Sequence, residues 1–424
     1  MNYTTAQEAA KLIKSGDRIY VHAVACTPNH LIDAIVERAS ELRKVEFCHI
    51  HTLGKAPYAD PKYRESFFVN SFFTGGNVRH TIREGNGTYT PIFLGSLPEA
   101  FDSGLVHLDV TLIQVSPPDE HGFCSLGTSV EATPAAIRSS KIVIAQVNKY
   151  IPRTFGDAAL HVSKIDVLVE HHTPLLTEYS DSFDDIEDKI GGYIAELIED
   201  GSTLQMGIGS IPEAVLQKLR NHKYLGLHTE MFADGVIDLI EAGALDCSKQ
   251  VSSNNKAIST FCVGTERIYK YLDNNPFFEF KECSYTNDPF IIRQNPKTIA
   301  INSAVEIDLT GQICADSIGP NIYSGVGGQV DFMRGATRSK GGKAIIAMSA
   351  TTKKGGNKIV PFLKNGAGVV TSRAHAQFIV TEYGVADLRA KSIVDRVHAL
   401  ANIAHPDFRE DILREYFDAT RNKQ

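Results

Sequence analysis

The fold is decided by Thr203-Leu204-Gln205-Met206-Gly207-Ile208-Gly209-Ser210-Ile211-Pro212, a short apolar run followed by a glycine loop and a proline. The run 203–206 predicts a buried strand, and Pro212 suits the first turn of a helix. Open α/β sheets bind ligands beyond the carboxyl ends of their strands, where backbone N–H groups of such a loop can face an anion. Because Pro212 stands where the dinucleotide-binding fingerprint needs a third glycine, the loop does not indicate a nicotinamide cofactor.

The same order of elements occurs near the N-terminus. In 9–35 a helical run ends at Gly16, and a strand, a small-residue loop, a proline and a second helical run follow. In 194–219 the order recurs, with Gly201 in the place of Gly16, 185 positions later. This repeat predicts two similarly built halves that arose by internal duplication.

The expected boundary between the halves is the polar, acidic stretch 177–188. Such a composition is typical of a surface connection, although Asp184 can equally begin the first helix of the second half. The predicted domains are therefore an N-terminal domain 1–183 and a C-terminal domain 184–424.

Short apolar runs alternate with helical stretches along both halves. A strand that is buried on both faces reads as a continuous apolar run, and alternation with helices is typical of parallel sheets. The predicted fold class is therefore α/β, with two open, mostly parallel sheets covered by helices. The runs that predict strands are 110–115, 141–147, 344–348 and 368–371.

Composition indicates an ordinary globular protein and excludes several functions. The chain has 424 residues, a formal net charge of −7 and 43% hydrophobic residues, with no long basic run, so neither nucleic acid nor an anionic membrane is an expected partner. The seven cysteines are scattered, which predicts reduced, mostly buried thiols. The N-terminus lacks the pattern of a secretory signal and no apolar run is long enough to span a bilayer, so we expect a cytoplasmic protein.

One carboxylate lies between two glycine loops in the second half. Glu230 occurs in Gly226-Leu227-His228-Thr229-Glu230-Met231-Phe232-Ala233-Asp234-Gly235, after a predicted strand and before the helical run 236–240. This places it at a strand end beside the first glycine loop. An isolated glutamate is usually a solvated surface residue, but a solvated face is less natural between an apolar strand and an apolar helix.

Five sequence blocks in the same order resemble the acetyl-CoA hydrolase/transferase family. They are Gln205–Pro212, Gly226–Gly235 and Tyr323–Phe332, with flanking blocks at Ser116–Phe123 and Glu382–Arg389. These glutamate-dependent enzymes include 4-hydroxybutyrate CoA-transferase and butyryl-CoA:acetate CoA-transferase. The resemblance covers nearly the whole chain and implies the CoA-transferase fold, which is similar to that of sugar-phosphate isomerases.

The resemblance also assigns roles to residues. It implies that Glu230 is the nucleophile, that the first glycine loop binds CoA, and that the second glycine loop stabilises an oxyanion. It implies CoA thioesters and short-chain carboxylic acids as substrates, no permanently bound cofactor, no metal, and a homo-oligomer, expected to be a dimer. The residues of the two loops are Gln205, Met206, Gly207, Ile208 and Gly209, and Gly325, Gly327 and Gly328.

Six further residues are weaker candidates for the CoA or acyl pocket. Met348, Ala350 and Lys353 follow a predicted strand end, although an exposed hairpin explains the lysine equally well. The others lie on loops of the first half, where packing alone would also explain them; the resemblance places the loop of His121 facing the active site. These loop candidates are His51, Gly76 and His121, with Gly54, Gly75, Asn77 and Gly95 on similar loops. No histidine pair has metal-ligand spacing.

Three functions remain open from the sequence. The leading hypothesis is transfer of CoA between short-chain carboxylates such as acetate, butyrate and 4-hydroxybutyrate, by ping-pong chemistry through a glutamyl-CoA thioester. Hydrolysis of acyl-CoA would use the same glutamate and differ only in the access of water. A phosphosugar isomerase-like or ligand-sensing α/β module would need neither Glu230 nor the second glycine loop. The sequence does not choose the acyl group.

Overall fold

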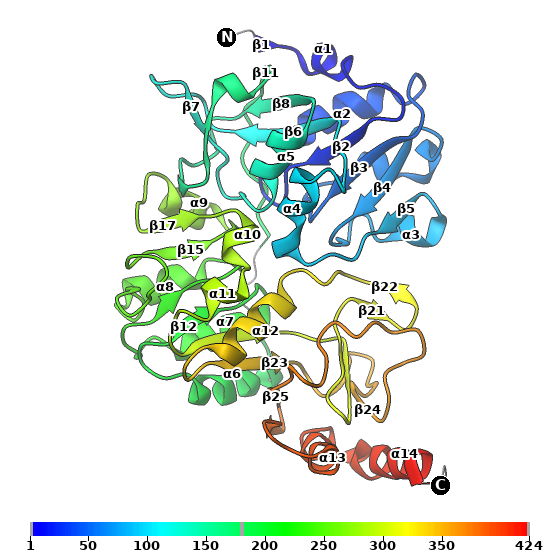
Figure 1. The fold of residues 1–424 in the computed structure, drawn as a ribbon, viewed down its shortest axis with the longest axis vertical. Coiled ribbons are helices and arrows are strands. Elements are labelled where there is room, and N and C mark those ends of the chain that lie inside the picture. The colour runs from blue at the N-terminus through cyan, green and yellow to red at the C-terminus, as the bar shows by residue number, and fades with distance from the viewer. Residues whose placement is uncertain (1–2, 179–181, 422–424) are drawn as a thin grey trace.

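The computed structural model describes residues 3–178 and 182–421. Figure 1 shows two bodies stacked along the long axis, with the blue and cyan N-terminal half above and the green-to-red half below. Helix α1 (Ala6–Ala10) and helix α14 (Arg409–Arg421) lie at opposite ends of the molecule. In the described part of the chain, no helix combines the length and the apolar character needed to cross a bilayer.

The N-terminal half is built on an eight-stranded sheet in which all neighbouring strands run parallel. Strands β3, β4 and β5 follow on one side of β2, whereas β6, β8 and β11 follow on its other side. The strand order therefore reverses between β2 and β6. In spatial order the strands are β1 (Tyr3–Thr4), β11 (Val167–Glu170), β8 (Ile142–Val147), β6 (Val110–Val115), β2 (Arg18–Val21), β3 (Val45–His49), β4 (Phe67–Ser71) and β5 (Gly87–Tyr89). The remaining helices of this half are α2 (Asn29–Glu37), α3 (His80–Glu84), α4 (Leu97–Asp102) and α5 (Thr133–Ser139).

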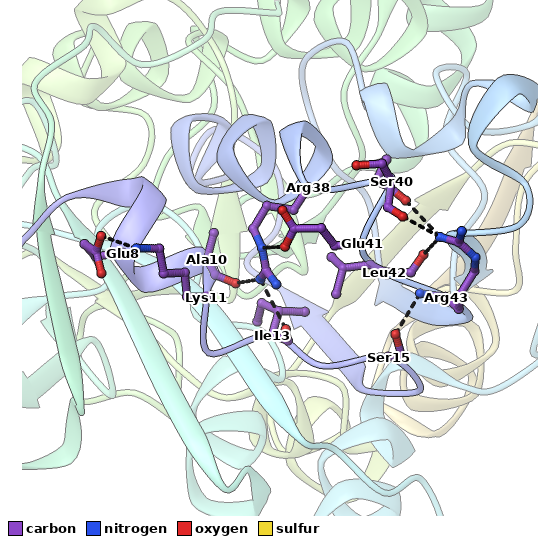
Figure 2. A network of polar contacts seen from close by, with 11 residues as sticks. Glu8, Ala10, Lys11, Ile13, Ser15, Arg38, Ser40, Glu41, Leu42 and Arg43 are labelled. Atoms are coloured by element: carbon purple, nitrogen blue, oxygen red, sulfur yellow. Dashed lines mark hydrogen bonds and ion pairs between the residues drawn. The ribbon is translucent and has the colours of Figure 1, made fainter.

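Two arginines hold the first helix–strand–helix unit together (Figure 2). Arg38, at the C-terminal end of α2, donates from its guanidinium to the carbonyl oxygens of Ala10 and Ile13. The backbone N–H of Arg43 donates to the hydroxyl of Ser15 at 2.9 Å. The Arg38 guanidinium thus adds donors to the backbone where α1 ends, which ties α1 to α2.

The C-terminal half is built on a six-stranded sheet that is parallel except for its last pair. Gly191 lets α6 approach α7 closely, because a Cβ atom there would lie 2.9 Å from Ala214. In order, the strands are β13 (Gly226–Leu227), β12 (Thr203–Gln205), β18 (Thr298–Asn302), β23 (Lys343–Ala347), β25 (Phe378–Thr381) and β26 (Gly384–Asp387). The helices are α6 (Asp185–Leu197), α7 (Ser210–Lys218), α8 (Gly235–Glu241), α9 (Glu266–Leu272), α10 (Cys283–Thr286), α11 (Pro289–Ile292), α12 (Gln329–Arg338) and α13 (Ile393–Asn402).

Small sheets complete the structure, and one of them joins the halves. In it, β9 (Phe155–Gly156) of the first half pairs with β17 (Phe278–Phe280) of the second, which pairs in turn with β15 (Ala257–Ser259). One hydrophobic core also runs from Ala25 in the first half to Val380 in the second. The other small sheets are β7 (Phe123–Ser125) with β10 (Ala159–His161), β14 (Met231–Phe232) with β16 (Phe261–Cys262), β20 (Ile313–Cys314) with β19 (Glu306–Asp308) and β24 (Ile359–Val360), and β21 (Ser317–Ile318) with β22 (Asn321–Ile322).

The α/β class and the mostly parallel sheets are confirmed. Both predicted repeat units fold as helix, strand, loop and helix, α1–β2–α2 and α6–β12–α7, while their origin by duplication stays a prediction. Asp184 forms the capping box of α6, so the helix begins within the predicted connection. The division at 183/184 also stays a prediction, and residues 179–181 of that connection lie outside the described residues. All seven cysteines are free and buried.

The prediction of a strand at 368–371 is wrong. Only Thr371 forms a bridge, to Ile313, and Val369 is 47% exposed. Gly368 lies against the carboxylate of Asp316, where a Cβ atom would come within 2.7 Å of an oxygen. The sheet continues instead through β25, whose four residues are all buried.

Candidate active site

Glu230 lies in the short connection between β13 and β14, at the carboxyl edge of the second sheet. Its backbone carbonyl accepts three hydrogen bonds, from the hydroxyl of Ser259 at 3.0 Å and from the backbone N–H groups of Thr260 at 3.2 Å and Phe261 at 3.1 Å. A carbonyl held by three donors fixes the position of the residue. Its side chain is therefore presented from a rigid backbone.

The carboxylate of Glu230 has two neutral donors. The amide Nδ2 of Asn287 lies 2.8 Å from Oε2, and the backbone N–H of Gly328 donates to the same carboxylate. Burial raises the pKa of Glu230 to about 7, because its desolvation outweighs these two hydrogen bonds. At neutral pH a substantial fraction of Glu230 is therefore ionised in a poorly solvated site, the form in which a carboxylate can act as a nucleophile.

A second carboxyl group lies close to the first. Asp331, in the first turn of α12, accepts hydrogen bonds from the side chain of Asn287 and, at 3.4 Å, from the backbone N–H of Gly95. Burial, and secondarily the charge of Glu230, raise the pKa of Asp331 to about 7. Within the described residues, no group of three or more histidine, cysteine, aspartate or glutamate side chains is arranged to hold a metal ion.

The second glycine loop, 323–328, contacts Glu230 directly. A Cβ atom at Gly328 would lie 1.8 Å from Oε2 of Glu230 and 2.1 Å from Nδ2 of Asn287, so no side chain fits there. Gly327 adopts a φ of 55° and lines the cavity that Glu230 faces. These contacts explain why the loop is built from glycine: only a bare backbone can bring its N–H groups to the carboxylate.

Loops of the N-terminal half hold this glycine loop in place. The N–H of Val326 donates to the hydroxyl of Tyr89 at 2.9 Å, and the N–H of Leu94 donates to the carbonyl of Gly327 at 3.1 Å. Arg79 donates to the carbonyl of Tyr323 at 2.6 Å and lies over its ring. The site is therefore assembled from both halves, with Glu230 supplied by the second.

The first glycine loop contributes Gly207 and Ile208 to the lining of the cavity that Glu230 faces. The N–H of Met206 donates to the hydroxyl of Thr229 at 3.2 Å, and Gln205 accepts from Asn302 at 3.0 Å, which fixes the end of β12. Gly209 has a φ of 114° and precedes α7, whose N-terminus has no side-chain cap. Because those N–H groups have no capping side chain, they can bind an anionic or carbonyl group of a ligand.

Glu230 faces a cavity of about 350 Å³ whose lining is mostly apolar. His51 is the imidazole of this lining, and burial lowers its pKa, so it is mainly neutral at pH 7. No lysine or arginine of the described residues lines the cavity. The apolar lining comprises Val24, Ile50, Phe72, Phe73, Ile92, Leu94, Leu97, Ile208, Met231, Phe261 and Val263, and the remaining residues are His51, Glu178, Gly207, Glu230, Ser303 and Gly327.

The six weaker candidates for the CoA or acyl pocket lie in different parts of the structure. His51 lines the cavity, whereas the structure places His121 outside it, on a surface turn where its side chain is 76% exposed and 3.6 Å from Glu120. His121 lies in the turn just before β7, so it does not line this cavity, and a role of its loop toward the active site stays a prediction. Met348 and Ala350 are buried in the core and Lys353 lies on an exposed turn, so none of the three lines the cavity.

Gly76 has no neighbour that a side chain would meet, and the adjacent Gly75 packs against the His51 ring. Sequence reasoning gave no role to Asn287 and noted Asp331 only as a flanking residue. Asn287 lies 57 positions from Glu230, between the short helices α10 and α11, where no periodic pattern marks it. A turn signal, Asn287-Asp288-Pro289, was the one cue available.

Comparison with known proteins gives matches over nearly the whole chain. The family model of the acetyl-CoA hydrolase/transferase N-terminal domain matches residues 2–177, and that of the C-terminal domain matches residues 264–416. A succinyl-CoA:acetate/propanoyl-CoA:succinate CoA transferase of Fasciola hepatica is 48% identical over 98% of this chain and 87% of its own length. The 4-hydroxybutyrate coenzyme A transferase of Clostridium kluyveri is 45% identical over 97% of this chain and 96% of its own. The crystal structure of 4-hydroxybutyrate CoA-transferase from Porphyromonas gingivalis superposes with a TM-score of 0.84 at 36% identity, covering 98% of this chain and 97% of that one.

Proposed function

The chain belongs to the acetyl-CoA hydrolase/transferase family, and we propose that it is a CoA-transferase that moves CoA between short-chain carboxylic acids, with Glu230 as the nucleophile. The observation that carries this proposal is a desolvated carboxylate facing an apolar cavity between two glycine loops. The names of the relatives at 45–48% identity agree with transfer, whereas a relative named acetyl-CoA hydrolase, from Neurospora crassa, is 28% identical.

The first half-reaction transfers CoA to the enzyme. Ionised Glu230 attacks the thioester carbonyl, the C–S bond breaks, and an acyl-glutamyl anhydride and CoA thiolate result. The thiolate then attacks the glutamyl carbonyl, which releases the first carboxylate and leaves a glutamyl-CoA thioester. The acceptor acid reverses these steps and leaves as its CoA thioester. Division of one exchange into covalent steps in this way predicts ping-pong kinetics.

The two glycine loops have separate roles in these steps. The N–H of Gly328 already donates to an oxygen of Glu230, so the same donor can stabilise the oxyanion that forms on the glutamyl carbonyl. Asn287, whose Nδ2 lies 2.8 Å from Oε2 of Glu230, is placed to do the same. The loop Gly207–Gly209 and the N-terminus of α7 offer N–H groups to CoA, which supports the proposed CoA contacts of Gln205 through Gly209.

The cavity indicates the class of acyl group. Its lining is apolar, its imidazole is mainly neutral at pH 7, and Glu178 adds a carboxylate rather than a cation. An acyl chain with a second carboxylate would therefore lose its hydration without gaining an ion pair. We expect kcat/KM for butyryl-CoA to exceed that for succinyl-CoA by at least about 100-fold, since desolvation of an unpaired charge costs several kcal/mol.

The remaining parts of the proposal are a cytoplasmic homodimer without a resident metal or organic cofactor. The carboxylate and the backbone donors supply the chemistry that the reaction needs. Sedimentation of the purified chain tests the dimer.

Initial-rate kinetics test the proposed function. With butyryl-CoA and acetate varied together, a transferase gives parallel double-reciprocal lines and releases less than stoichiometric CoA when acetate is omitted. Steady release of CoA without any carboxylate would instead indicate hydrolysis. Neither activity, together with thermal stabilisation by a phosphosugar but not by CoA, would favour the ligand-sensing alternative.

A further inference from the structure

The proposed reaction uses one carboxylate, but the site contains two. Asp331 is 9% exposed and lies at the third position of α12, where its side chain meets the amide of Asn287. The same amide donates to Glu230 at 2.8 Å. One NH2 group thus joins the two carboxyl groups. An inference about this pair deepens the proposed function and rests on Glu230 being the nucleophile.

The surroundings of Glu230 and Asp331 lack the positive charge that would stabilise two ionised carboxylates. In the described part of the chain, neither Glu230 nor Asp331 forms an ion pair with a lysine, arginine or histidine. The other titratable groups that face Asp331 are Asp288 and the buried thiol of Cys283, and both would add negative charge if ionised. Two adjacent charges with only neutral donors are strongly disfavoured in a poorly solvated site.

The hydrogen-bond inventory agrees with one proton on the pair. Asn287 gives its NH2 to the two carboxyl groups, Gly328 gives one N–H to Glu230, and Gly95 gives a long 3.4 Å bond to Asp331. The amide oxygen of Asn287 is buried and has no partner among the described residues. The few neutral donors around the pair are thus matched to one charge rather than two.

Titration supports this geometry. Burial raises the pKa of Glu230 to about 7, and burial together with the charge of Glu230 raises that of Asp331 to about 7. When two carboxyl groups interact this closely, the proton belongs to the pair rather than to either residue. Near pH 7 the pair then holds one proton and one negative charge.

We propose that Glu230 and Asp331 share one proton in the resting enzyme, and that this proton leaves when Glu230 enters the covalent adduct. Formation of the glutamyl-CoA thioester from ionised Glu230 and acyl-CoA yields a free carboxylate and itself consumes no proton. The neutral adduct no longer opposes ionisation of Asp331, which releases its proton to solvent. Cleavage of the adduct restores the charge on Glu230, and Asp331 takes a proton back. The site carries one negative charge in both states.

Asp331 is thus a positioning residue that keeps the charge of the site constant. It acts through Asn287 rather than on the substrate. At a merely structural Asp331, a substitution would change kcat or stability but would move neither proton release nor the pH profile. These two readouts separate the roles.

Proton release is measured with a pH indicator in weakly buffered solution, with butyryl-CoA and no acceptor, against the adduct counted by mass spectrometry. At pH 7 we expect the wild-type chain to release close to one proton per glutamyl-CoA, and none at pH 9, where the pair has already lost it. The Asp331→Asn variant should release a small fraction of a proton per adduct at pH 7. Asp288→Asn, the same change at a carboxylate that faces Asp331 but does not share its proton, should alter proton release much less than Asp331→Asn does.

The pH profile gives the second readout. Loss of the neighbouring charge in Asp331→Asn should shift the rise of kcat/KM with pH to lower pH by about one unit. The Asp331→Glu variant, which keeps a carboxyl group, should retain proton release. If Asp331→Asn does not fold, the pH series of the wild-type chain and of Asp331→Glu decides.

The outcomes separate this inference from the proposed function. An adduct that forms with equal proton release in wild type and Asp331→Asn, or with release that does not vary between pH 7 and pH 9, would overturn the shared proton alone. Absence of any adduct in the wild-type chain would overturn the nucleophile and this inference together.

Discussion

Glu131 in the N-terminal half and Glu230 in the C-terminal half are both glutamates for which the described residues show no ion pair, and the two have different surroundings. Glu131, in the N-terminal half, is fully buried and accepts hydrogen bonds from the hydroxyls of Tyr20 at 2.9 Å, Ser129 at 3.1 Å and Thr133 at 2.7 Å. Glu230, in the C-terminal half, has one amide and one backbone N–H, and it faces a cavity.

The number of donors and the access to a cavity explain why one of these carboxylates is reactive and the other is not. Glu131 accepts hydrogen bonds from three hydroxyls, and it does not line the cavity that Glu230 faces. Its backbone carbonyl accepts from Cys283 of the other half at 2.9 Å, so this residue ties the halves together. Glu230 keeps fewer donors and an open side, so its charge is poorly stabilised and accessible to substrate.

The largest expected effect is that of Glu230→Gln on activity. This change removes the nucleophile but keeps the shape, so CoA exchange should fall by at least about 10,000-fold, as when other covalent nucleophiles are removed. Stability should move the opposite way. The folded-state pKa of about 7 lies above the ordinary value of 4.5, so ionised Glu230 destabilises the fold.

The stability gain of Glu230→Gln should accordingly appear as pH rises from 4.5 through 7 and should vanish in acid. Coupled-assay kinetics and melting curves at pH 5 and pH 8 measure the two effects. Activity within tenfold of wild type would contradict the assignment of the nucleophile.

Asn287→Ala should have the next largest effect on activity. It removes the donor that lies 2.8 Å from Glu230, and loss of one oxyanion donor typically costs about 100-fold to 1,000-fold in kcat. KM for acyl-CoA should change much less, because the amide contacts the reacting carboxylate rather than CoA. A change confined to KM would show that Asn287 holds substrate instead.

Glu131→Gln should reduce stability while largely retaining activity, which is the reverse of the effects expected for Glu230→Gln. Replacing a charged acceptor by a neutral one weakens three hydrogen bonds, so the free energy of unfolding should fall by about 2 kcal/mol. The folded variant should retain CoA transfer within about tenfold, since Glu131 touches no cavity-lining carboxylate. Urea unfolding and initial rates measured on one preparation make the comparison. A loss of activity as deep as that of Glu230→Gln would remove the distinction between the two glutamates.

His121→Ala should have the smallest effect. Its exposed side chain and its 3.6 Å contact with Glu120 contribute less than about 1 kcal/mol, as is usual for surface pairs. Activity and melting temperature should both stay within error of wild type. A large fall in kcat/KM would show that the turn before β7 reaches the substrate.

The parts that sequence predicted are those encoded locally. The loop Gly207–Gly209 follows a strand and begins a helix, and Glu230 lies at the adjacent strand end, so strand order alone brings them together. The glycine loop at 325–328 was identified through the family resemblance, and the structure gives a reason for Gly328, where a Cβ atom would meet Glu230. These features depend on a few neighbouring residues and on the geometry of parallel sheets.

The parts that sequence missed depend on contacts between distant segments. Asn287 and Asp331 become partners of Glu230 only when α10 and α12 pack at the sheet edge, and Tyr89 and Leu94 reach the glycine loop from the other half. The run 368–371 is apolar but has no sheet neighbour beyond one bridge, because the strand position is filled by β25. Apolar composition identifies candidates for strands, and pairing decides among them.

Peptide mass spectrometry of the chain after incubation with butyryl-CoA, without acceptor and under conditions that preserve a thioester, tests the central claim most directly. We expect a CoA-sized adduct on the peptide that carries Glu230 and none on the peptide that carries Glu131. Glu131→Gln should still form the adduct, and Glu230→Gln should not. An adduct on another residue, or rapid transfer of CoA to acetate by Glu230→Gln, would contradict it.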